Sequence, residues 1–449
     1  MGFLSLSAQN KPINYLVEST SAVSSEKTMP FWITSNTRAQ VPNSNVFQLH
    51  TGVFSDFSTE EDKFDISYKA AFTGYTAATN ELFVDELYLG LRYNQIQLHL
   101  GVKHGDLLWN GISSSNGNIA MSNNARSFPG YNFELADFLY IPFLNNKLAV
   151  KASYGDFLMN DNRVVDNTRL HAKSIVFKTV LSNRLDMITG LYHYAQWAGT
   201  SPEYGKQPSG FKNYLRIVFG SVGGVDAEQR DQNNALGNHL GTYLLQFDYK
   251  GDKQNWSFYW SHLFEDGSGR ELDNFPDALY GLNVDFKAPE SFVSHLLTEF
   301  TYTANMSGGS TLDRRARDDY FNNGLYESGW TYFGNTIGSP YFTTEAIDEN
   351  GVAKGIIQGD NRFMAFNLGI KGAVKAVKYK AMLSHVTYFG WFMNEYEPNR
   401  QQFSGLLELT FPEGETIPFD IIAGTAFDTG SYRSKNIGAF IKISKNGVF

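Results

Sequence analysis

The stretch from Asp313 to Tyr341 gathers side chains that can recognise a sugar. Three arginines and three aspartates lead into a run rich in tyrosine, with a tryptophan, several glycines and a proline. Flat aromatic rings can lie against sugar faces, while guanidinium and carboxylate groups can hydrogen-bond to hydroxyls. The stretch has neither a helical nor a two-residue apolar period. Loops of such length in compact folds are usually functional or disordered, and the density of aromatic residues argues against disorder. We therefore interpret it as a long binding loop.

The candidate binding residues fall into three groups along the chain. The densest group lies in this loop, where arginine can also pair with a sugar carboxylate in bidentate fashion. The other two groups lie in shorter polar connections and combine an aromatic or basic side chain with amides or carboxylates. In that order, the candidates are Trp330, Tyr332, Tyr326, Tyr320, Arg317, Asp318 and Asp319, then Gln196 and Trp197, then Glu265, Asp266 and Arg270.

A catalytic use of the carboxylates is the competing interpretation. Glu265 with Asp277, or Asp318 with Asp319, offers an acid and a base for glycoside hydrolysis. Adjacent carboxylates do not easily straddle a glycosidic bond, and the sequence has no GxSxG or HExxH motif and no cysteine. The nine histidines are scattered without the spacing of metal ligands. We expect a protein without catalysis, metal or cofactor.

The composition favours one large strand-rich architecture over several ordinary domains. Aromatic residues make up 15% of the 449 residues and the mean hydropathy is −0.31. No run approaches the roughly 20 apolar residues of a membrane helix. This balance suits a transmembrane barrel, because only every second residue of a strand faces lipid. The net charge of −9 argues against a nucleic-acid partner.

From Val46 onward the apolar period is two, which predicts about 18 strands of membrane-spanning length in an antiparallel barrel. Between Ala195 and Leu240 two long connections flank a single expected strand, so the count is one strand out of step there. The expected strands cover residues 46–57, 64–72, 82–93, 96–102, 131–143, 147–154, 171–181, 185–194, 211–220, 240–249, 256–262, 280–286, 292–303, 363–371, 374–388, 403–411, 417–427 and 437–443.

The connections between these strands are of two kinds. Some are tight turns, such as Asn145-Asn146, and others are long and polar, such as residues 104–130 and 304–362. Short turns at one end and long loops at the other are typical of outer-membrane barrels, whose long loops lie outside the cell. A soluble β-sandwich array or propeller is the alternative, but no repeat of propeller length is visible. In a barrel, aromatic residues also form girdles at the membrane interface, and charge pairs also brace the lumen. Any single candidate residue can therefore have a structural role instead of a binding role.

The chain divides into three expected segments. Residues 1–9 contain FLSLSAQ, which is typical of the tail of a secretory signal. Residues 10–45 are expected to form a periplasmic helical cap or plug, with a short helix over residues 14–25. Residues 46–449 form the barrel, including the long loop 304–362.

The last strand predicts a further partner. Asn436, Gly438, Ile441 and Ile443, followed by the terminal Phe449, resemble the terminal signal of barrels that the outer-membrane assembly machinery inserts. We therefore expect this machinery to contact the chain through its C-terminal strand.

Several word-like motifs resemble the Wzi family of capsule assembly proteins, in the version common among Bacteroidetes. The resemblance implies an 18-stranded outer-membrane barrel with an N-terminal periplasmic helical segment. It also implies outer loops that act as a lectin for capsular polysaccharide. The motifs run in order over most of the chain: PFWITSN at 30–36, LHAKSIVFK at 170–178, HYAQWAG at 193–199, NHLGTY at 238–243, FEDGSG at 264–269, PDALYGL at 276–282 and YFNNGLYESGWTYFGNTIGSP at 320–340.

We expect a monomeric barrel in the outer membrane of a Gram-negative bacterium, surrounded by lipid and lipopolysaccharide, that binds capsular or related surface polysaccharide. The alternatives are a porin or transport channel and a non-catalytic scaffold in a larger outer-membrane complex. The lumen separates these alternatives, because a lectin or scaffold should be plugged and a porin should conduct.

Overall fold

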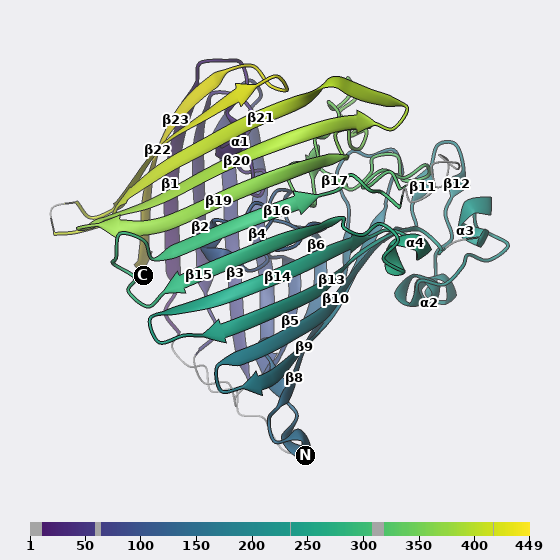
Figure 1. Cartoon of the computed structure of the whole chain (residues 1–449), viewed down its shortest axis with the longest axis horizontal. Helices are drawn as coiled ribbons and strands as arrows, with labels where there is room; N and C mark the ends of the chain where they lie inside the picture. Colours follow the sequence, from purple (N-terminus) through teal and green to yellow (C-terminus); the bar gives the residue numbers. More distant parts are fainter. Residues whose placement is uncertain (1–10, 59–63, 234, 308–317, 416) are drawn as a thin grey trace.

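The computed structural model describes residues 11–58, 64–233, 235–307, 318–415 and 417–449. In this part of the chain, 18 antiparallel strands pair in sequence order and close into a barrel (Figure 1). β6 and β7 both pair with β8 and count as one broken strand. The prediction of an all-β, transmembrane-type barrel with about 18 strands is confirmed.

The wall strands are 7 to 18 residues long apart from the short β7. They are β1 (Asn14–Ser24), β2 (Val46–Ser55), β3 (Asp65–Thr76), β4 (Glu81–Tyr93), β5 (Ile96–Val102), β6 (Pro129–Leu135), β7 (Leu139–Tyr140), β8 (Leu148–Leu158), β9 (Arg169–Ser182), β10 (Leu185–Trp197), β13 (Asn238–Lys250), β14 (Gln254–Phe264), β15 (Ala278–Phe286), β16 (His295–Tyr302), β19 (Phe363–Val374), β20 (Val377–Trp391), β21 (Asn394–Phe411), β22 (Asp420–Gly430) and β23 (Asn436–Val448).

The loops carry short elements of their own. Among the described residues, no helix is both long and apolar enough to cross a membrane. The loop elements are α1 (Phe31–Thr34), the 3₁₀ turns Trp109–Gly111 and Pro142–Leu144, the hairpins β11 (Thr200–Ser201) with β12 (Gly205–Lys206) and β17 (Thr331–Tyr332) with β18 (Asn335–Thr336), and the helices α2 (Phe211–Phe219), α3 (Gln229–Asn233) and α4 (Gly267–Arg270).

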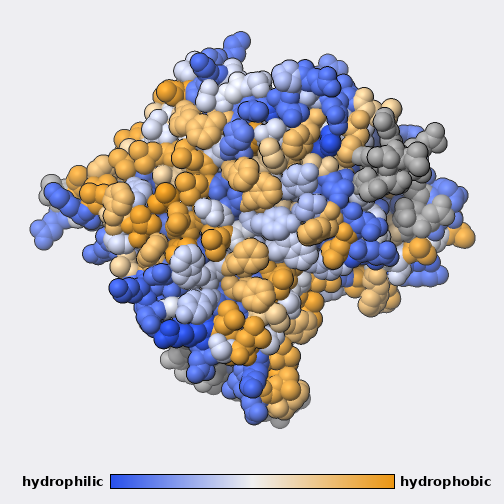
Figure 2. Space-filling model, in the orientation of Figure 1, coloured by the Kyte–Doolittle hydropathy of each residue, from blue (hydrophilic) through white to orange (hydrophobic). Residues whose placement is uncertain are grey.

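Side chains alternate between the two faces of the wall. On β2, Phe47 and Leu49 are 57% and 47% exposed, whereas Gln48 and His50 between and beside them are 2% and 6% exposed. Figure 2 shows apolar side chains gathered over the strands and hydrophilic ones towards the ends of the barrel. Because lipid offers no hydrogen-bond partners, polar side chains of such a wall belong in the lumen. The wall is therefore suited to a lipid bilayer.

The N-terminal strand corrects one prediction. Residues 14–25 were expected to form a helix, but β1 pairs with β2 on one side and with β23 on the other, and so closes the barrel. The segment contains Tyr15, Val17, Thr20 and Val23, whose residue types favour strands. Its lumen-facing Glu18 lies 2.9 Å from Lys442 of β23. The edges of β2 and β23 thus decide the conformation of residues 14–24, whose own apolar pattern is weak.

Helix α2 corrects a second prediction, the strand over residues 211–220. Its exposed residues Phe211, Leu215 and Phe219 are spaced by four, the helical period, and its aromatic content imitated a strand. One strand was therefore missed at β1 and one was added at α2, so the expected total was still about 18. The mismatch noted between Ala195 and Leu240 has its origin here.

Helix α1 is where the expected periplasmic cap differs most from the structure. It follows β1 at the long-loop end and packs inside the barrel against β21 and β22. The Phe31 amide donates to Asp428 Oδ2 at 3.0 Å, and the indole of Trp32 donates to Ser384 Oγ at 3.1 Å. The helix therefore belongs to the lumen near the loop end and does not cover the short-turn end.

Two long loops cross the lumen and, with α1, form what we call the plug (residues 103–128, 318–362 and α1). The two loops hydrogen-bond to each other, as the Ser122 amide donates to Ile337 O and the Ser339 amide to Ile119 O, both at 2.9 Å. The ring of Phe31 stacks on Tyr341, with centroids 5.5 Å apart. The plug is thus one packed body inside the wall.

A buried glutamate on β16 anchors the plug to the far side of the barrel. Glu299, which is 3% exposed, accepts hydrogen bonds from Ser113 Oγ and the Ser114 amide, both at 2.6 Å. It also accepts from Tyr259 Oη at 2.5 Å and Asn367 Nδ2 at 3.0 Å on neighbouring wall strands. Since residues 113–114 follow β5, this carboxylate holds a loop that has crossed the lumen.

We predict that Glu299→Ala loosens residues 103–128 and raises the ion conductance of the reconstituted barrel. The change leaves several buried donors without an acceptor, at about 1–3 kcal/mol for each. Planar-bilayer recording measures the conductance, and heat-modifiable gel migration reports whether the barrel has folded. Thr298→Ala, an exposed neighbour on the same strand, is the control. Wild-type conductance from a folded Glu299→Ala barrel would contradict the anchoring role.

Candidate functional site

The four aromatic residues predicted as a sugar platform lie inside the plug. Trp330 and Tyr320 are 0% exposed, Tyr332 is 1% and Tyr326 is 3% exposed. The indole of Trp330 donates to Ala120 O at 2.6 Å. Aromatic rings with one polar atom can fill a lumen and still reach a carbonyl. In this structure these residues are packing residues, and a sugar does not reach them.

The second predicted group is divided between the two faces of the wall. Gln196 faces the lumen, donates to Gly329 O at 3.0 Å and accepts from Asn238 Nδ2 at 2.9 Å. Trp197, its neighbour, faces outward and packs with Ile217 of α2. Adjacent strand residues point to opposite faces, so this pair does not form one binding surface. Arg317 lies outside the described residues.

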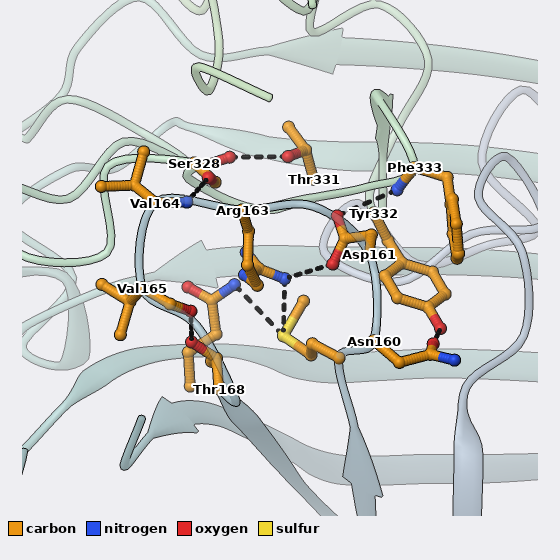
Figure 3. A network of polar contacts seen from close by, with 12 residues as sticks. Asn160, Asp161, Arg163, Val164, Val165, Thr168, Ser328, Thr331, Tyr332 and Phe333 are labelled. Atoms are coloured by element: carbon orange, nitrogen blue, oxygen red, sulfur yellow. Dashed lines mark hydrogen bonds and ion pairs between the residues drawn. The ribbon is translucent and has the colours of Figure 1, made fainter. Parts of the chain in front are cut away.

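The loop between β8 and β9 fastens the plug from the side (Figure 3). Arg163 is buried and donates to Asp161 Oδ1 at 3.2 Å and to Gly329 O at 3.5 Å. The other oxygen of Asp161 accepts from the Phe333 amide at 3.1 Å. This buried pair bridges two loops that are far apart in the sequence, and it fixes the turn that carries Trp330.

A pocket of about 600 Å³ opens at the loop end, on the outer side of the wall. Tyr194 and Leu240 pack in the lumen core, so the alternate residues His193 and His239 on the same strands face outward. We call this the rim pocket. It is lined by Lys173, Leu191, His193, Val218, Phe219, Gly220, Val222, Glu228, Asp231, Ala235, Gly237, Asn238, His239, Tyr243, Phe264, Glu265, Asp266, Gly267, Arg270, Asp318, Asp319, Asn322, Asn323, Gly324 and Leu325.

The roof of the rim pocket is α2, which is fastened to the outer wall. Ile217 is 0% exposed and packs on Ala195 of β10. Tyr214 Oη donates to Asp156 Oδ2 at 2.6 Å, and Lys173 Nζ donates to Val218 O at the C-terminal end of the helix. The helix and the wall therefore leave a cleft between them.

Five of the predicted residues meet in this pocket. Glu265 and Asp266 come from the β14–α4 connection, Arg270 ends α4, and Asp318 and Asp319 come from the start of the described plug loop. Asp266 Oδ1 caps α4 by accepting from the Gly269 amide at 3.2 Å, which turns Arg270 to the surface. Two groups that are separate in the sequence thus converge on one cavity.

Sequence reasoning missed part of the pocket. Asp231, Asn238, His239 and Tyr243 line it together with His193. The motifs HYAQWAG and NHLGTY contain four of these residues, but the motifs showed only family resemblance. The strand register decides which face of the wall each residue occupies. Knowledge of this register was needed to predict that these residues line the pocket.

Burial changes the acid–base behaviour of the carboxyl groups around the pocket. It raises the pKa of Asp318 and of Asp231 to about 6, and it raises that of Glu265 well above its ordinary value. Asp277, just beyond the pocket, is 0% exposed, and burial raises its pKa to about 7. Its carboxylate accepts from the Asn305 and Met306 amides and from Tyr320 Oη.

Comparison with known proteins now decides the family. The profile of the capsule assembly protein Wzi family matches residues 19–350. This chain belongs to the Wzi family. No curated protein matches its sequence. The Wzi protein of Escherichia coli, described as a carbohydrate-binding β-barrel involved in group 1 capsule assembly, has a similar structure, with a TM-score of 0.58 at 11% identity over 96% of this chain and 84% of that one.

Two further solved structures share the fold of this Wzi-family barrel. OccK5 of Pseudomonas aeruginosa has a TM-score of 0.51 at 8% identity, covering 98% of both chains. OccAB4 of Acinetobacter baumannii has a TM-score of 0.51 at 10% identity, covering 98% of this chain and 99% of that one. As a Wzi-family barrel with a lipid-facing wall, this protein lies in the outer membrane of a Gram-negative bacterium.

A group of possible metal ligands lies in the lumen of the Wzi-family barrel, away from the rim pocket. The ligand atoms of Asp85, Glu86 and His104 are all within 4.8 Å of one another. A register shift in the β3–β4 pairing lets two successive carboxylates face inward. Lys69 Nζ lies 2.5 Å from Glu86, and Gln40 Nε2 donates to Asp85 at 2.9 Å. These carboxylates therefore already have protein partners.

We predict that Trp330→Ala weakens the plug. Loss of a fully buried tryptophan costs about 3–5 kcal/mol when a cavity remains. Limited proteolysis of the plug loops, followed by mass spectrometry, should show faster cleavage than in wild type. Trp256→Ala, on the lipid-facing side of β14 and 38% exposed in wild type, is the control. Equal protection of Trp330→Ala and wild type would mean that the residue does not support the plug.

We also predict that the loop end loosens as the pH rises from about 4 to about 7. Because the pKa of Asp318 is raised, the folded loop holds a proton that the loosened loop releases. The stability of the folded loop is therefore highest below the unfolded pKa of about 3.8, and it falls as the pH rises through about 6. Hydrogen exchange of residues 318–325, corrected for intrinsic rates, should be faster at high pH. Asp318→Asn should reduce this dependence, and Asp166→Asn, an exposed loop carboxylate, should not. An identical pH dependence in both variants would contradict the assignment.

Proposed function

We propose that this barrel binds a capsular or other surface polysaccharide in the rim pocket and helps to assemble or attach the capsule at the cell surface. The observation that carries the proposal is the convergence of carboxylates, amides, a cation and aromatic rings on one open cavity. Carboxylate and amide oxygens accept hydrogen bonds from sugar hydroxyls, and Tyr243 and Phe264 supply apolar surface. Family membership supports the same role.

Binding without catalysis fits the state of the carboxylates. Asp277 is fully buried and occupied by three donors, so it does not reach a sugar in the rim pocket. Glu265 accepts from the Phe321 amide at 2.7 Å, and Asp319 accepts from Asn322, Gln358 and Asn361. Carboxylates that position the loop in this way are poorly placed as an acid and base pair. We propose that the pocket needs neither a metal nor a cofactor.

The lumen favours a binding protein over a porin. The plug crosses it, and the anchor at Glu299 ties the plug to the far wall. We propose that the barrel acts as a monomer, since the β1–β23 pairing leaves no free edge in the described barrel sheet for a second copy. Lipopolysaccharide around the wall and the assembly machinery at β23 remain proposed partners.

Arg270 offers the sharpest test of the rim pocket, because its side chain is exposed and lines the cavity. We predict that Arg270→Ala weakens binding of capsular polysaccharide from the same strain about tenfold, the effect of one charge-assisted hydrogen bond. Asp266→Asn keeps the acceptor that caps α4 and tests the charge alone. Binding to the detergent-solubilised barrel is measured by calorimetry, with an acapsular extract as the ligand control.

Arg184→Ala is the matched protein control, because that arginine lies at the short-turn end and its side chain is 54% exposed. It should bind the polysaccharide as wild type does. If wild type shows no saturable binding, the proposed function fails and a scaffold role takes its place. If Arg270→Ala and Asp266→Asn both bind normally, the site lies elsewhere on the loops.

A further inference from the structure

We propose that the rim pocket takes its glycan in membrane-anchored form, as an outer-leaflet glycolipid whose sugars occupy the pocket and whose acyl chain lies in an adjoining groove on the outer wall. This inference rests on the proposed function and names the class of ligand. It follows from the groove, from the order of polar and apolar rows across the wall, and from the exposed face of α2.

The groove is a second cavity, of about 310 Å³, that continues from the rim pocket along the wall. The two cavities share Lys173, Leu191 and His193. The remaining outward-facing side chains of the groove are mostly apolar, with Phe133 and Ile175 among them. A ligand that fills both cavities therefore needs one polar and one apolar part.

Strand register arranges the two parts in the order that a membrane requires. Tyr154, Lys173 and His193 form one row across β8, β9 and β10. One step closer to the short-turn end, Ala152, Ile175 and Leu191 form the next row, and Leu191 continues to Tyr243 of the rim pocket. The apolar row therefore lies deeper in the bilayer than the polar row, as the tail of an amphiphile lies below its head. Ala152 is the smallest side chain of its row and gives the groove its depth.

Helix α2 places the opening of the cleft at the level of the lipid. Phe211 and Phe219 are 75% and 76% exposed and Leu215 is 40% exposed, all on one side of the helix. The other side is fastened to the wall through Tyr214 and Ile217. In Figure 1 the helix projects beside the loop ends of β10 and β13. A helix with one apolar face at this height is typical of the membrane interface, so a lipid can enter the cleft sideways.

The charges of the rim pocket select a sugar head over a phosphate. Asp231, Asp266 and Asp318 line the polar end of the cavity. Carboxylates accept hydrogen bonds from hydroxyls but repel a phosphate. Lys173, the cation closest to the groove, is already occupied by the carbonyl at the end of α2. An anionic phospholipid is therefore the poorer ligand.

The test uses the full barrel in phosphatidylcholine nanodiscs that contain either diglucosyl diacylglycerol or phosphatidylglycerol, with bound lipid counted by native mass spectrometry. Wild type should retain diglucosyl diacylglycerol in preference to phosphatidylglycerol. Ala152→Trp fills the groove and should reduce retention about tenfold. Ala423→Trp, on the outer face of β22, makes the same change outside the groove and should have no effect.

Soluble polysaccharide binding separates this inference from the proposed function. Ala152→Trp should bind soluble polysaccharide as wild type does, whereas Arg270→Ala should bind it about tenfold more weakly. Equal retention of diglucosyl diacylglycerol by Ala152→Trp and wild type would overturn the assignment of the groove as the acyl-chain site. A preference of wild type for phosphatidylglycerol would overturn the claim that the pocket selects a sugar headgroup. Soluble binding without glycolipid retention would overturn only this inference. Absence of both in wild type would overturn the proposed function as well.

Discussion

The charged and amide side chains of the membrane-spanning wall need partners on the lumen side, because the lipid side offers none. The wall obeys this constraint by alternation, and the lumen consequently fills with donors and acceptors that need one another. Glu299 illustrates the result. A single carboxylate accepts a hydroxyl and a backbone N–H from a loop that starts on the opposite side of the barrel. It also accepts the Tyr259 hydroxyl and the Asn367 amide of wall strands. The plug is stabilised by these hydrogen bonds as well as by apolar packing.

The plug in turn decides what remains available for a ligand. Its aromatic residues fill the lumen, so the described part of the stretch that the sequence predicted to bind sugar is largely buried. Only the start of its described part, near Asp318 and Asp319, reaches the rim. There it meets α4 and the ends of the wall strands, and the remaining polar groups form an open cavity.

The same wall that excludes polar groups from lipid makes exceptions at the loop end. Asp156 and His171 face outward, 3.0 Å apart, and Tyr214 of α2 shares the carboxylate. These groups are satisfied because an external helix covers them, and that helix presents a new apolar face to the membrane. The rim pocket thus lies beside this apolar face, under a helix that is fastened to the outer wall.

The sequence by itself determined the barrel. Strand periodicity, turn residues and loop length are local properties, so they are visible without knowing what each segment contacts. Tertiary structure decided the rest. Residues 14–24 became a strand because two edges were available, and residues 211–219 became a helix because the outer wall offered a surface for Ile217. Whether Trp330 faces a ligand or the lumen depends on partners such as Ala120, which is distant in the sequence. Whether His193 faces inward or outward depends on the strand register. A local pattern carries no information about such partners, and for that reason the sequence indicated a binding loop but not the pocket.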